Sequence, residues 1–265
     1  MDISGKTVLV TGATGGLGQA VTRALAARGA RLVLTGRRAD VLEPLAAEVG
    51  GRAIACDLSD RTALDALVDD AGAVDALVAN AGIPASGFVA EYSVEQIDRA
   101  LDVNLRAPIL LARALSPAMV ARGDGHLVFM SSLSGKVAVH RSAIYSATKF
   151  ALRGFALGMR EDLLTTGVGV SVVFPGPIAE AGMFADTSVE LPRFAGSRGP
   201  EDVGAAVVEA IERNRAEIDV APLPMRLGSS LGSVAPTVLS AVNRRLGAES
   251  IATRVAESRS QRSKR

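Results

Sequence analysis

The chain has 265 residues, with 29 Lys and Arg against 28 Asp and Glu, for a formal net charge of +1. That balance excludes the strongly basic surface typical of nucleic-acid-binding proteins, and a single cysteine excludes an intramolecular disulfide. The amino terminus lacks the basic and apolar regions of a signal peptide, and no apolar stretch is long enough to cross a bilayer. We therefore expect a cytoplasmic protein with no nucleic-acid and no membrane partner.

Short apolar, β-branched runs alternate along the chain with segments of helical periodicity. Leu17–Arg28 and Arg61–Ala71 place apolar residues three or four apart, and Val94–Arg122 and Ala143–Thr165 predict unusually long helices. Strands that are apolar on both faces and separated by helices indicate a parallel sheet covered on both sides. The predicted fold class is α/β, a single-domain Rossmann-like doubly wound sheet. The predicted strands are Thr7–Val10, Arg31–Leu34, Arg52–Ala55, Ala76–Ala79, His126–Met130 and Val170–Phe174.

The alternation continues to about residue 220, which predicts one dinucleotide-binding and catalytic domain over residues 1–222. Residues 223–256 read as a helical extension of that domain, interrupted at Pro236, and residues 257–265 as a disordered basic tail. The extension carries an apolar stripe that favours core or a subunit interface over a membrane anchor. The stripe consists of Leu227, Leu231, Val234, Val238, Val242 and Leu246.

A glycine-rich loop follows the first predicted strand and opens the first predicted helix, with the sequence TGATGGLG from Thr11 to Gly18. Glycines let the backbone turn sharply and approach a pyrophosphate, whose charge then faces a helix amino terminus. The alternative is an ordinary βα turn, since Val21 stands where a further glycine of the common motif would fall. The residues expected to bind the cofactor here are Gly12, Thr14, Gly15, Gly16, Leu17 and Gly18.

The end of the second strand bears on the choice of coenzyme. Sites for NAD usually place an acidic residue there, where it accepts from the ribose 2′-hydroxyl. This chain has Gly36 followed by Arg37 and Arg38, and a guanidinium suits a phosphate. The pattern favours NADP(H) over NAD(H), the alternative being that both arginines only begin and solubilise the next helix.

Tyr145 and Lys149 lie four residues apart in a helical segment, so they share one face. The chain has few residues of either type, and a nearby ammonium lowers the pKa of a phenol toward neutrality. Ser132 ends a strand at the edge where such sheets bind ligands. Asn104 falls within a helical stretch that disfavours asparagine, which suggests a functional placement. These residues predict a proton-transfer site.

Taken together, the motifs resemble those of the short-chain dehydrogenase/reductase superfamily, of the Tyr-dependent type. The resemblance covers residues 5–215 or so, and its motifs occur in the family's order. Glu180 departs from the pattern, because the family often has threonine at that position. The matching positions are Thr11-Gly12, Gly16-Leu17-Gly18, Asp57-Leu58, Asn80-Ala81-Gly82, Asn104, Ser132, Tyr145, Lys149 and Pro175-Gly176.

The resemblance implies a role for each position. Tyr145 would exchange the proton, Ser132 would bind the substrate oxygen, Lys149 would hold the nicotinamide ribose, and Asn104 would anchor a water of the proton relay. It also implies a homotetramer assembled through the two long helices, with a dimer as the alternative. The remaining cofactor positions would be Asp57 and Leu58 beside the adenine, Asn80, Ala81 and Gly82 beside the ribose, and Pro175, Gly176 and Ile178 beside the nicotinamide.

We therefore expect a reductase or dehydrogenase of a small-molecule carbonyl or alcohol. Apolar residues of a loop over about residues 180–199 suggest a lipophilic substrate. The alternatives are a non-catalytic nucleotide-binding regulator on the same fold and an epimerase or dehydratase that uses the same Tyr and Lys. His126 and His140 form no metal site, and Cys56 reads as a small buried hydrophobe.

Overall fold

The structure, a computed structural model, describes residues 1–179, 196–238 and 253. Parallel strands form one sheet in the order β3-β2-β1-β4-β5-β6-β7, which confirms the predicted fold class. The predicted strand segments are all present, some of them one to three residues longer. The strands are β1 (Thr7–Thr11), β2 (Arg31–Gly36), β3 (Arg52–Ala55), β4 (Ala76–Ala79), β5 (Gly125–Met130), β6 (Val168–Pro175) and β7 (Glu217–Val220).

The direction in which strands are added reverses between β1 and β4. β1 pairs with β2 on one side and with β4 on the other. At such a switch point the loops after the strands diverge to opposite faces, leaving room for a ligand beyond the carboxyl ends. The fold therefore positions the ends of β1 and β4 at the centre of a candidate site.

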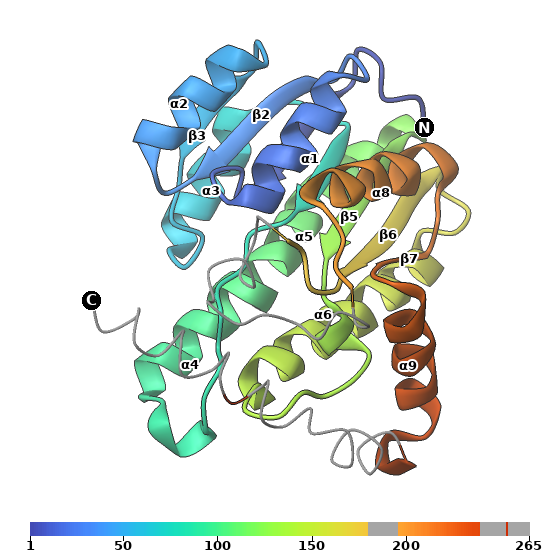
Figure 1. Ribbon diagram of the computed structural model, residues 1–265. Helices are drawn as coiled ribbons and strands as arrows, with labels where there is room; N and C mark the ends of the chain where they lie inside the picture. The colour runs from blue at the N-terminus through green and yellow to red at the C-terminus, as the bar shows by residue number, and fades with distance from the viewer. Residues whose placement is uncertain (180–195, 239–252, 254–265) are drawn as a thin grey trace.

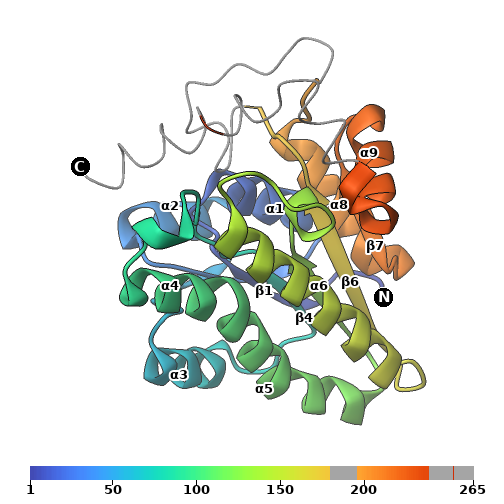
Figure 2. The same cartoon turned by 90° about the horizontal axis from the view of Figure 1, so that it is seen from below.

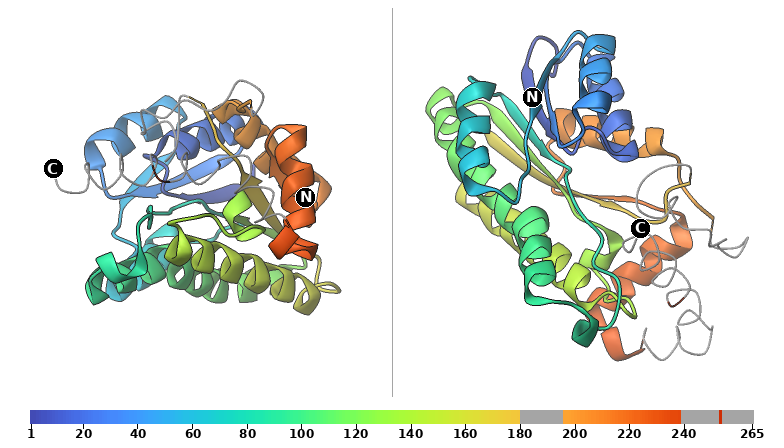
Figure 3. Two further views of the ribbon diagram at one scale, coloured as in Figure 1. Left: turned by 60° about the horizontal axis from the view of Figure 1, so that its bottom comes forward. Right: turned by 90° about the vertical axis from the view of Figure 1, so that its left-hand side faces the viewer.

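Helices cover both faces of the sheet, as Figures 1 and 2 show from two directions. One layer contains α1, α2 and α8, and the other contains α3, α4, α5 and α6, a separation also visible in Figure 3. These helices are α1 (Gly16–Ala26), α2 (Ala39–Glu48), α3 (Arg61–Ala71), α4 (Val94–Leu101), α5 (Ala107–Arg122), α6 (Ala143–Asp162) and α8 (Pro200–Arg213).

Each face of the sheet has its own apolar core. On the first, Val21 of α1 and Val207 of α8 pack against β1 side chains such as Val8. On the second, Leu111 of α5 and Leu152 of α6 belong to one cluster with alternate strand residues. Because neighbouring strand residues point to opposite faces, both must be apolar, which explains the continuous runs in the sequence.

The long helix expected over Val94–Arg122 is interrupted by a π-helical segment, η2 (Asp102–Arg106), between α4 and α5. Pro108 gives the physical reason. Its ring would clash with the carbonyl of Asn104 in a regular α-helix, and it has no N–H to bond that carbonyl. The wider π turn, closed by a bond from the Ala107 N–H to the Asp102 carbonyl, removes the clash and places Asn104 in the interior.

The described carboxyl-terminal residues include the helix α9 (Leu223–Val234), which ends before Pro236. Leu227, Leu231, Val234 and Val238 are exposed, so they do not belong to the core, and the other alternative, a subunit interface, stays a prediction. Residues 180–195 of the predicted substrate loop (residues 180–199), most of residues 239–256 and the tail lie outside the described residues. Among the helices described, none has the length and hydropathy that crossing a membrane requires.

Candidate active site

The glycine-rich loop after β1 is packed too tightly for side chains. Gly12 has a φ of +64°, and a Cβ there would lie 2.7 Å from the Ala81 Cα. A Cβ at Gly18 would collide with the carbonyl oxygen of Gly12. These glycines therefore allow the loop to close on the chain that follows β4 while α1 begins beside it.

The amino terminus of α1 has no side-chain cap, unlike those of α3 and α4. Asp60 accepts hydrogen bonds from two N–H groups at the start of α3, and Ser93 caps α4 in the same way. The cap position of α1 is Gly15, and its first turn has no acidic residue. Free N–H groups and the positive end of the helix dipole are what a phosphate needs, so this loop fits the pyrophosphate of a dinucleotide.

At the end of β2, Gly36 faces the same loop. A Cβ at Gly36 would lie 3.0 Å from the Thr14 methyl carbon, which leaves little room for any side chain. Arg37 and Arg38 are both exposed, and the Arg38 guanidinium donates a 2.5 Å hydrogen bond to the Thr14 carbonyl. The structure thus places one of the two predicted arginines in contact with the loop.

Asp57 and Leu58 follow β3 at the same edge of the sheet. Leu58 is buried, and the Asp57 carboxylate accepts hydrogen bonds from the Ser59 N–H and hydroxyl and pairs with Arg99 at 3.0 Å. Burial alone would raise the pKa of Asp57, but the hydrogen bonds from Ser59 and the Arg99 guanidinium lower it to about 2. The carboxylate is therefore ionised at neutral pH.

The segment after β4 contacts both the glycine loop and the predicted proton-transfer residues. The Asn80 amide donates to the carbonyls of Thr11 and Gly12 at 3.0 and 3.2 Å, and the Ala81 N–H donates to the Thr11 hydroxyl at 3.0 Å. A Cβ at Gly82 would lie 3.5 Å from the Lys149 Nζ and, equally, from the Asn104 Oδ1.

Tyr145 and Lys149 lie in the first turns of α6, as the four-residue spacing predicts. The Lys149 side chain passes into the interior with 2% of its surface exposed, and its Nζ donates a 2.8 Å hydrogen bond to the Met130 carbonyl. The same Nζ lies 5.6 Å from the centre of the Tyr145 ring. Burial lowers the pKa of Lys149 to about 8.

Asn104 is fully buried and reaches the same region from η2. Its Oδ1 accepts from the Ile83 N–H at 2.7 Å, and its Nδ2 donates to the Ile83 carbonyl at 3.0 Å. Nδ2 also lies 3.4 Å from the Thr148 hydroxyl on α6. This two-way bond fixes the π segment to the chain after β4, beside the Tyr145 and Lys149 helix.

Ser132 follows β5 and caps a short 3₁₀ turn, η3 (Leu133–Gly135). Its hydroxyl accepts from the Ser134 N–H at 3.1 Å and lies 3.5 Å from the Pro175 carbonyl at the end of β6. Gly176 continues β6 by donating to the Val220 carbonyl, and Ile178 is buried. Glu180 lies outside the described residues.

Sequence reasoning missed two residues of this edge. The Ser131 hydroxyl donates to the Lys149 carbonyl at 3.0 Å, and Lys136 is 7% exposed and paired with carboxylates of β7. A serine beside another serine and a lysine in a polar loop give no distinguishing pattern. The only signal was the scarcity of lysine in the chain.

Residues set aside from the sequence have ordinary environments. His126 is buried with its Nε2 2.8 Å from the Ser171 hydroxyl, and burial lowers its pKa to about 3. His140 is exposed and packs edge-on against Phe88. Cys56 is 7% exposed, and burial followed by the nearby Asp57 raises the pKa of its thiol to about 11. This environment agrees with the expected small buried hydrophobe.

A doubly wound sheet with a glycine loop, a Tyr-x-x-x-Lys pair and a serine at one edge defines a class of dinucleotide-dependent enzymes. Comparison with known proteins agrees: a sequence model described as short chain dehydrogenase matches residues 6–191. Ketoacyl reductase HetN of Nostoc sp. is 38% identical over 97% of this chain and 94% of its own length. The chain therefore belongs to the short-chain dehydrogenase/reductase family and is an oxidoreductase of that family.

Two further proteins that are similar to this chain are also named as reductases or dehydrogenases. Dehydrogenase/reductase SDR family member 7B of Xenopus tropicalis is 33% identical, covering 87% of this chain and 82% of its own. The solved 3-oxoacyl-[acyl-carrier protein] reductase of Brucella melitensis is 30% identical with a TM-score of 0.75, covering 83% of this chain and 91% of its own.

Proposed function

We propose that the protein is an NADP(H)-dependent oxidoreductase that interconverts a lipophilic carbonyl compound and its alcohol, with Tyr145 exchanging the proton. The observation that carries the proposal is the Tyr145–Lys149 pair on α6. The Lys149 carbonyl accepts a hydrogen bond from Ser131, the residue before Ser132, and the Lys149 Nζ lies beside Gly82 after β4. When bound, the nicotinamide supplies or accepts the hydride. The side chains of the protein must hold the coenzyme and the substrate and must exchange the proton.

In this proposal, Tyr145 donates its phenolic proton to the substrate oxygen during reduction and accepts a proton during oxidation. The Lys149 ammonium, 5.6 Å from the centre of the phenol ring, favours the phenolate and so aids release of that proton. Ser132 holds the substrate oxygen with its hydroxyl. Asn104, fixed to Ile83 in the interior, orders the water that returns a proton to the site.

The cofactor half of the site uses the residues at the ends of the first four strands. The loop from Gly12 to Gly18 would hold the pyrophosphate, with Gly15, Gly16 and Leu17 at the uncapped end of α1. The preference for NADP(H) is supported by Gly36, which offers no carboxylate, and by the exposed guanidinium groups of Arg37 and Arg38. The remaining contacts are Thr14, Asp57, Leu58, Asn80, Ala81, Gly82, Lys149, Pro175, Gly176 and Ile178.

The substrate proposal relies on the names of relatives. HetN is called a ketoacyl reductase, and the Brucella melitensis structure a 3-oxoacyl-[acyl-carrier protein] reductase. A 3-oxoacyl thioester carries a ketone on a lipophilic chain, which agrees with the apolar residues in the sequence that follows β6. We therefore propose carbonyl compounds of this type as the first substrates to test.

We also propose a homo-oligomer, a tetramer or a dimer, assembled through α5 and α6. The outer face of α6 carries the exposed Phe150 and two glycines, Gly154 and Gly158, around which a Cβ would meet no other atom. A flat face of small residues beside a large apolar one suits close packing against a second copy.

The test is coenzyme oxidation, followed by absorbance, with a panel of ketones and short 3-oxoacyl thioesters. Tyr145→Phe should lower turnover by a factor of about 10² to 10⁴, because only the proton-bearing oxygen is lost, while coenzyme affinity stays unchanged. The only other tyrosine of the chain, Tyr92, provides the matched control Tyr92→Phe.

The alternatives give different results. A non-catalytic regulator would bind coenzyme but oxidise none of it with any member of the panel. An epimerase or dehydratase would convert its substrate while its coenzyme showed no net change. Equal activity of Tyr145→Phe and Tyr92→Phe would contradict the role given to Tyr145.

A further inference from the structure

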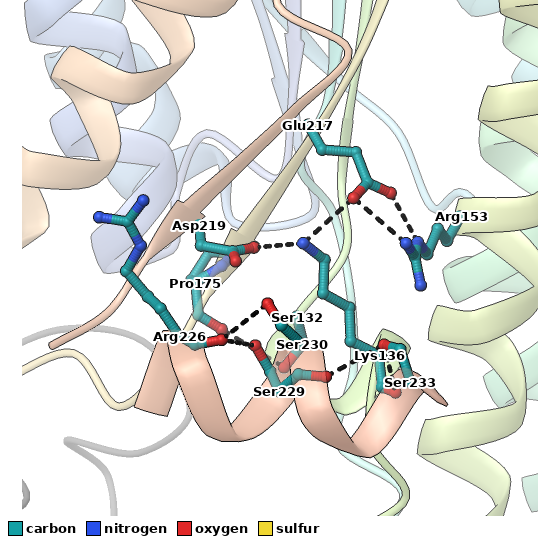
Figure 4. A network of polar contacts seen from close by, with 10 residues as sticks. All are labelled: Ser132, Lys136, Arg153, Pro175, Glu217, Asp219, Arg226, Ser229, Ser230 and Ser233. Carbon is teal, nitrogen blue, oxygen red and sulfur yellow. Dashed lines mark hydrogen bonds and ion pairs between the residues drawn. The ribbon is translucent and has the colours of Figure 1, made fainter. Parts of the chain in front are cut away.

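A group of four charges, centred on the buried Lys136 and otherwise partly exposed, lies just beyond Ser132 in the chain, on the side of the site away from the glycine loop. Lys136 follows η3, and its Nζ donates to the Asp219 carboxylate at 2.6 Å and lies 3.1 Å from that of Glu217. Both carboxylates belong to β7. The same Nζ lies 4.1 Å above the Phe174 ring. The Lys136 side chain is therefore fixed to β7 directly after the segment that carries Ser132 (Figure 4).

Glu217 is shared between two cations. Arg153 donates to its carboxylate through Nε at 2.6 Å and through a terminal nitrogen at 3.2 Å. Arg153 lies on α6 about one helical turn beyond Lys149 and two beyond Tyr145. One carboxylate thus connects the segment after Ser132 with the helix that carries the proposed proton donor, as the dashed lines of Figure 4 show.

At its other end, the same segment is attached to the backbone of α6. The Ser131 hydroxyl donates to the Lys149 carbonyl at 3.0 Å. A Cβ at Gly135 would lie 2.7 Å from that carbonyl oxygen, so η3 is in close contact with the helix. The segment from Ser131 to Lys136 is therefore fixed at both ends, on one side to α6 directly and on the other through β7.

The Ser132 hydroxyl, by contrast, has little to hold it. Its contacts are a 3.1 Å bond from the Ser134 N–H within its own turn and a 3.5 Å contact with the Pro175 carbonyl. The position of the hydroxyl relative to Tyr145 must then follow from the segment that carries it. That segment is oriented by the charge network, because the buried Lys136 Nζ is held at once by two carboxylates of β7 and by the Phe174 ring.

We propose that Lys136, Glu217 and Arg153 are positioning residues that set the distance between the Ser132 hydroxyl and the Tyr145 phenol. This proposal rests on the proposed function, since it assigns the network a role only through Ser132. A displacement of about 1 Å in a reacting group can lower a rate by as much as 10²-fold. The network touches neither the glycine loop nor the cofactor positions after β3, so its loss should change the chemical step and leave coenzyme binding intact.

The experiment compares Glu217→Gln and Lys136→Met with wild-type enzyme under single-turnover conditions. Each should lower kcat by roughly tenfold, with the dissociation constant for NADPH unchanged. Lys6→Met is the matched control, because it removes a lysine from an equally short pair with Asp124 at the opposite, amino edge of the sheet. If a single change prevents folding, Lys136→Met with Asp219→Asn removes one positive and one negative charge together.

A double-mutant cycle separates positioning from simple stability. In a Ser132→Ala background, Lys136→Met should have almost no further effect on kcat, because the hydroxyl that it positions is gone. If instead the two effects multiply in full, or if NADPH binding weakens with kcat, the positioning role of the network is wrong while the proposed function stands. If Ser132→Ala alone leaves kcat unchanged, the role of Ser132 in the proposed function and the positioning role of the network are wrong together.

Discussion

The two halves of the carboxyl edge are built in opposite ways. Beside β1 and β2, the loop is shaped by the absence of side chains: Gly12, Gly18 and Gly36 each face an atom that a Cβ would meet at 3.0 Å or less. The other half, beside β5 and β7, is shaped by polar side chains in the interior, since Lys149 and Lys136 are only 2% and 7% exposed. The first half is therefore sensitive to added atoms and the second to removed charges and donors.

The largest effect is expected from adding one carbon to the glycine half. Gly12→Ala should weaken NADPH binding by roughly 1,000-fold, about 4 kcal/mol, because the new Cβ would lie 2.7 Å from backbone. Gly5→Ala is the control: Gly5 has a similar φ of +70°, yet a Cβ there would meet nothing within 4 Å. Fluorescence titration with NADPH measures both. Equal weakening by the two would mean that backbone strain, not the close approach to Ala81, limits this loop.

A somewhat smaller effect is expected on stability in the charged half. The pKa of Lys149 is about 8 in the folded protein against 10.5 ordinarily, so between these values the unfolded chain binds more protons. The contribution of Lys149 to the free energy of unfolding therefore increases as the pH rises between these two values. We expect Lys149→Met to exceed wild type in stability at about pH 7, and this excess to shrink by about 3 kcal/mol by about pH 10.

Urea unfolding at the two pH values measures this change. Lys6→Met is the control, because the Asp124 hydrogen bond raises the pKa of Lys6, so that its contribution is lost only above its ordinary range. A stability difference for Lys149→Met that is the same at both pH values would show that the buried ammonium is not penalised.

The proposed preference for NADP(H) tests the glycine half further, because Arg37 and Arg38 follow β2 beside the glycine loop. Arg37→Ala and Arg38→Ala should each lower the ratio of kcat/KM for NADPH over NADH by about tenfold. Arg38 also bonds the Thr14 carbonyl, so its variant should weaken NADH use as well, whereas Arg37→Ala should spare it. Gly36 is less suitable for the test, because a Cβ there would press on Thr14. A wild-type enzyme that prefers NADH would overturn the coenzyme proposal.

The smallest effect on turnover is expected at the proposed subunit interface. Gly154→Arg places a large side chain on α6 where nothing within the chain obstructs it, so the fold should tolerate it. Sedimentation should show dissociation to smaller species, while activity per chain changes by no more than about twofold. Gly228→Arg, on α9 and also unobstructed, is the control and should leave the assembly as it is.

The sequence predicts an element well where an apolar pattern marks it, and poorly where the element depends on polar contacts with distant residues. The segments Ala76–Ala79 and Arg61–Ala71 have the predicted bounds, because their apolar pattern follows directly from packing in the core. Arg52–Ala55 also has the predicted bounds, although this edge strand is largely exposed. β7 was not named as a strand, because this edge strand carries Glu217 and Asp219 where central strands carry apolar residues. In the structure, the carboxylates of β7 pair with Lys136 and Arg153, and these contacts join segments that are far apart in the sequence.

The proposed site residues were found through fixed spacings, which the fold converts to proximity. Tyr145 and Lys149 share a helix face at four residues, and Ser132 and Asn104 reach the same edge from other elements. The π turn at Asn104 could not be read from periodicity, since it depends on the Pro108 ring meeting a carbonyl in three dimensions. Likewise, the Ser131 bond to Lys149 depends on how β5 and α6 meet.

The buried thiol of Cys56 has a practical consequence for experiments on this protein. Alkylating reagents and disulfides react with the thiolate, and burial keeps the only cysteine of the chain protonated far above neutral pH. Native protein should therefore give almost no background with maleimide dyes. A cysteine introduced at a chosen surface position, for example on α9 or near the start of α6, would carry a single fluorophore or spin label without removal of the natural one.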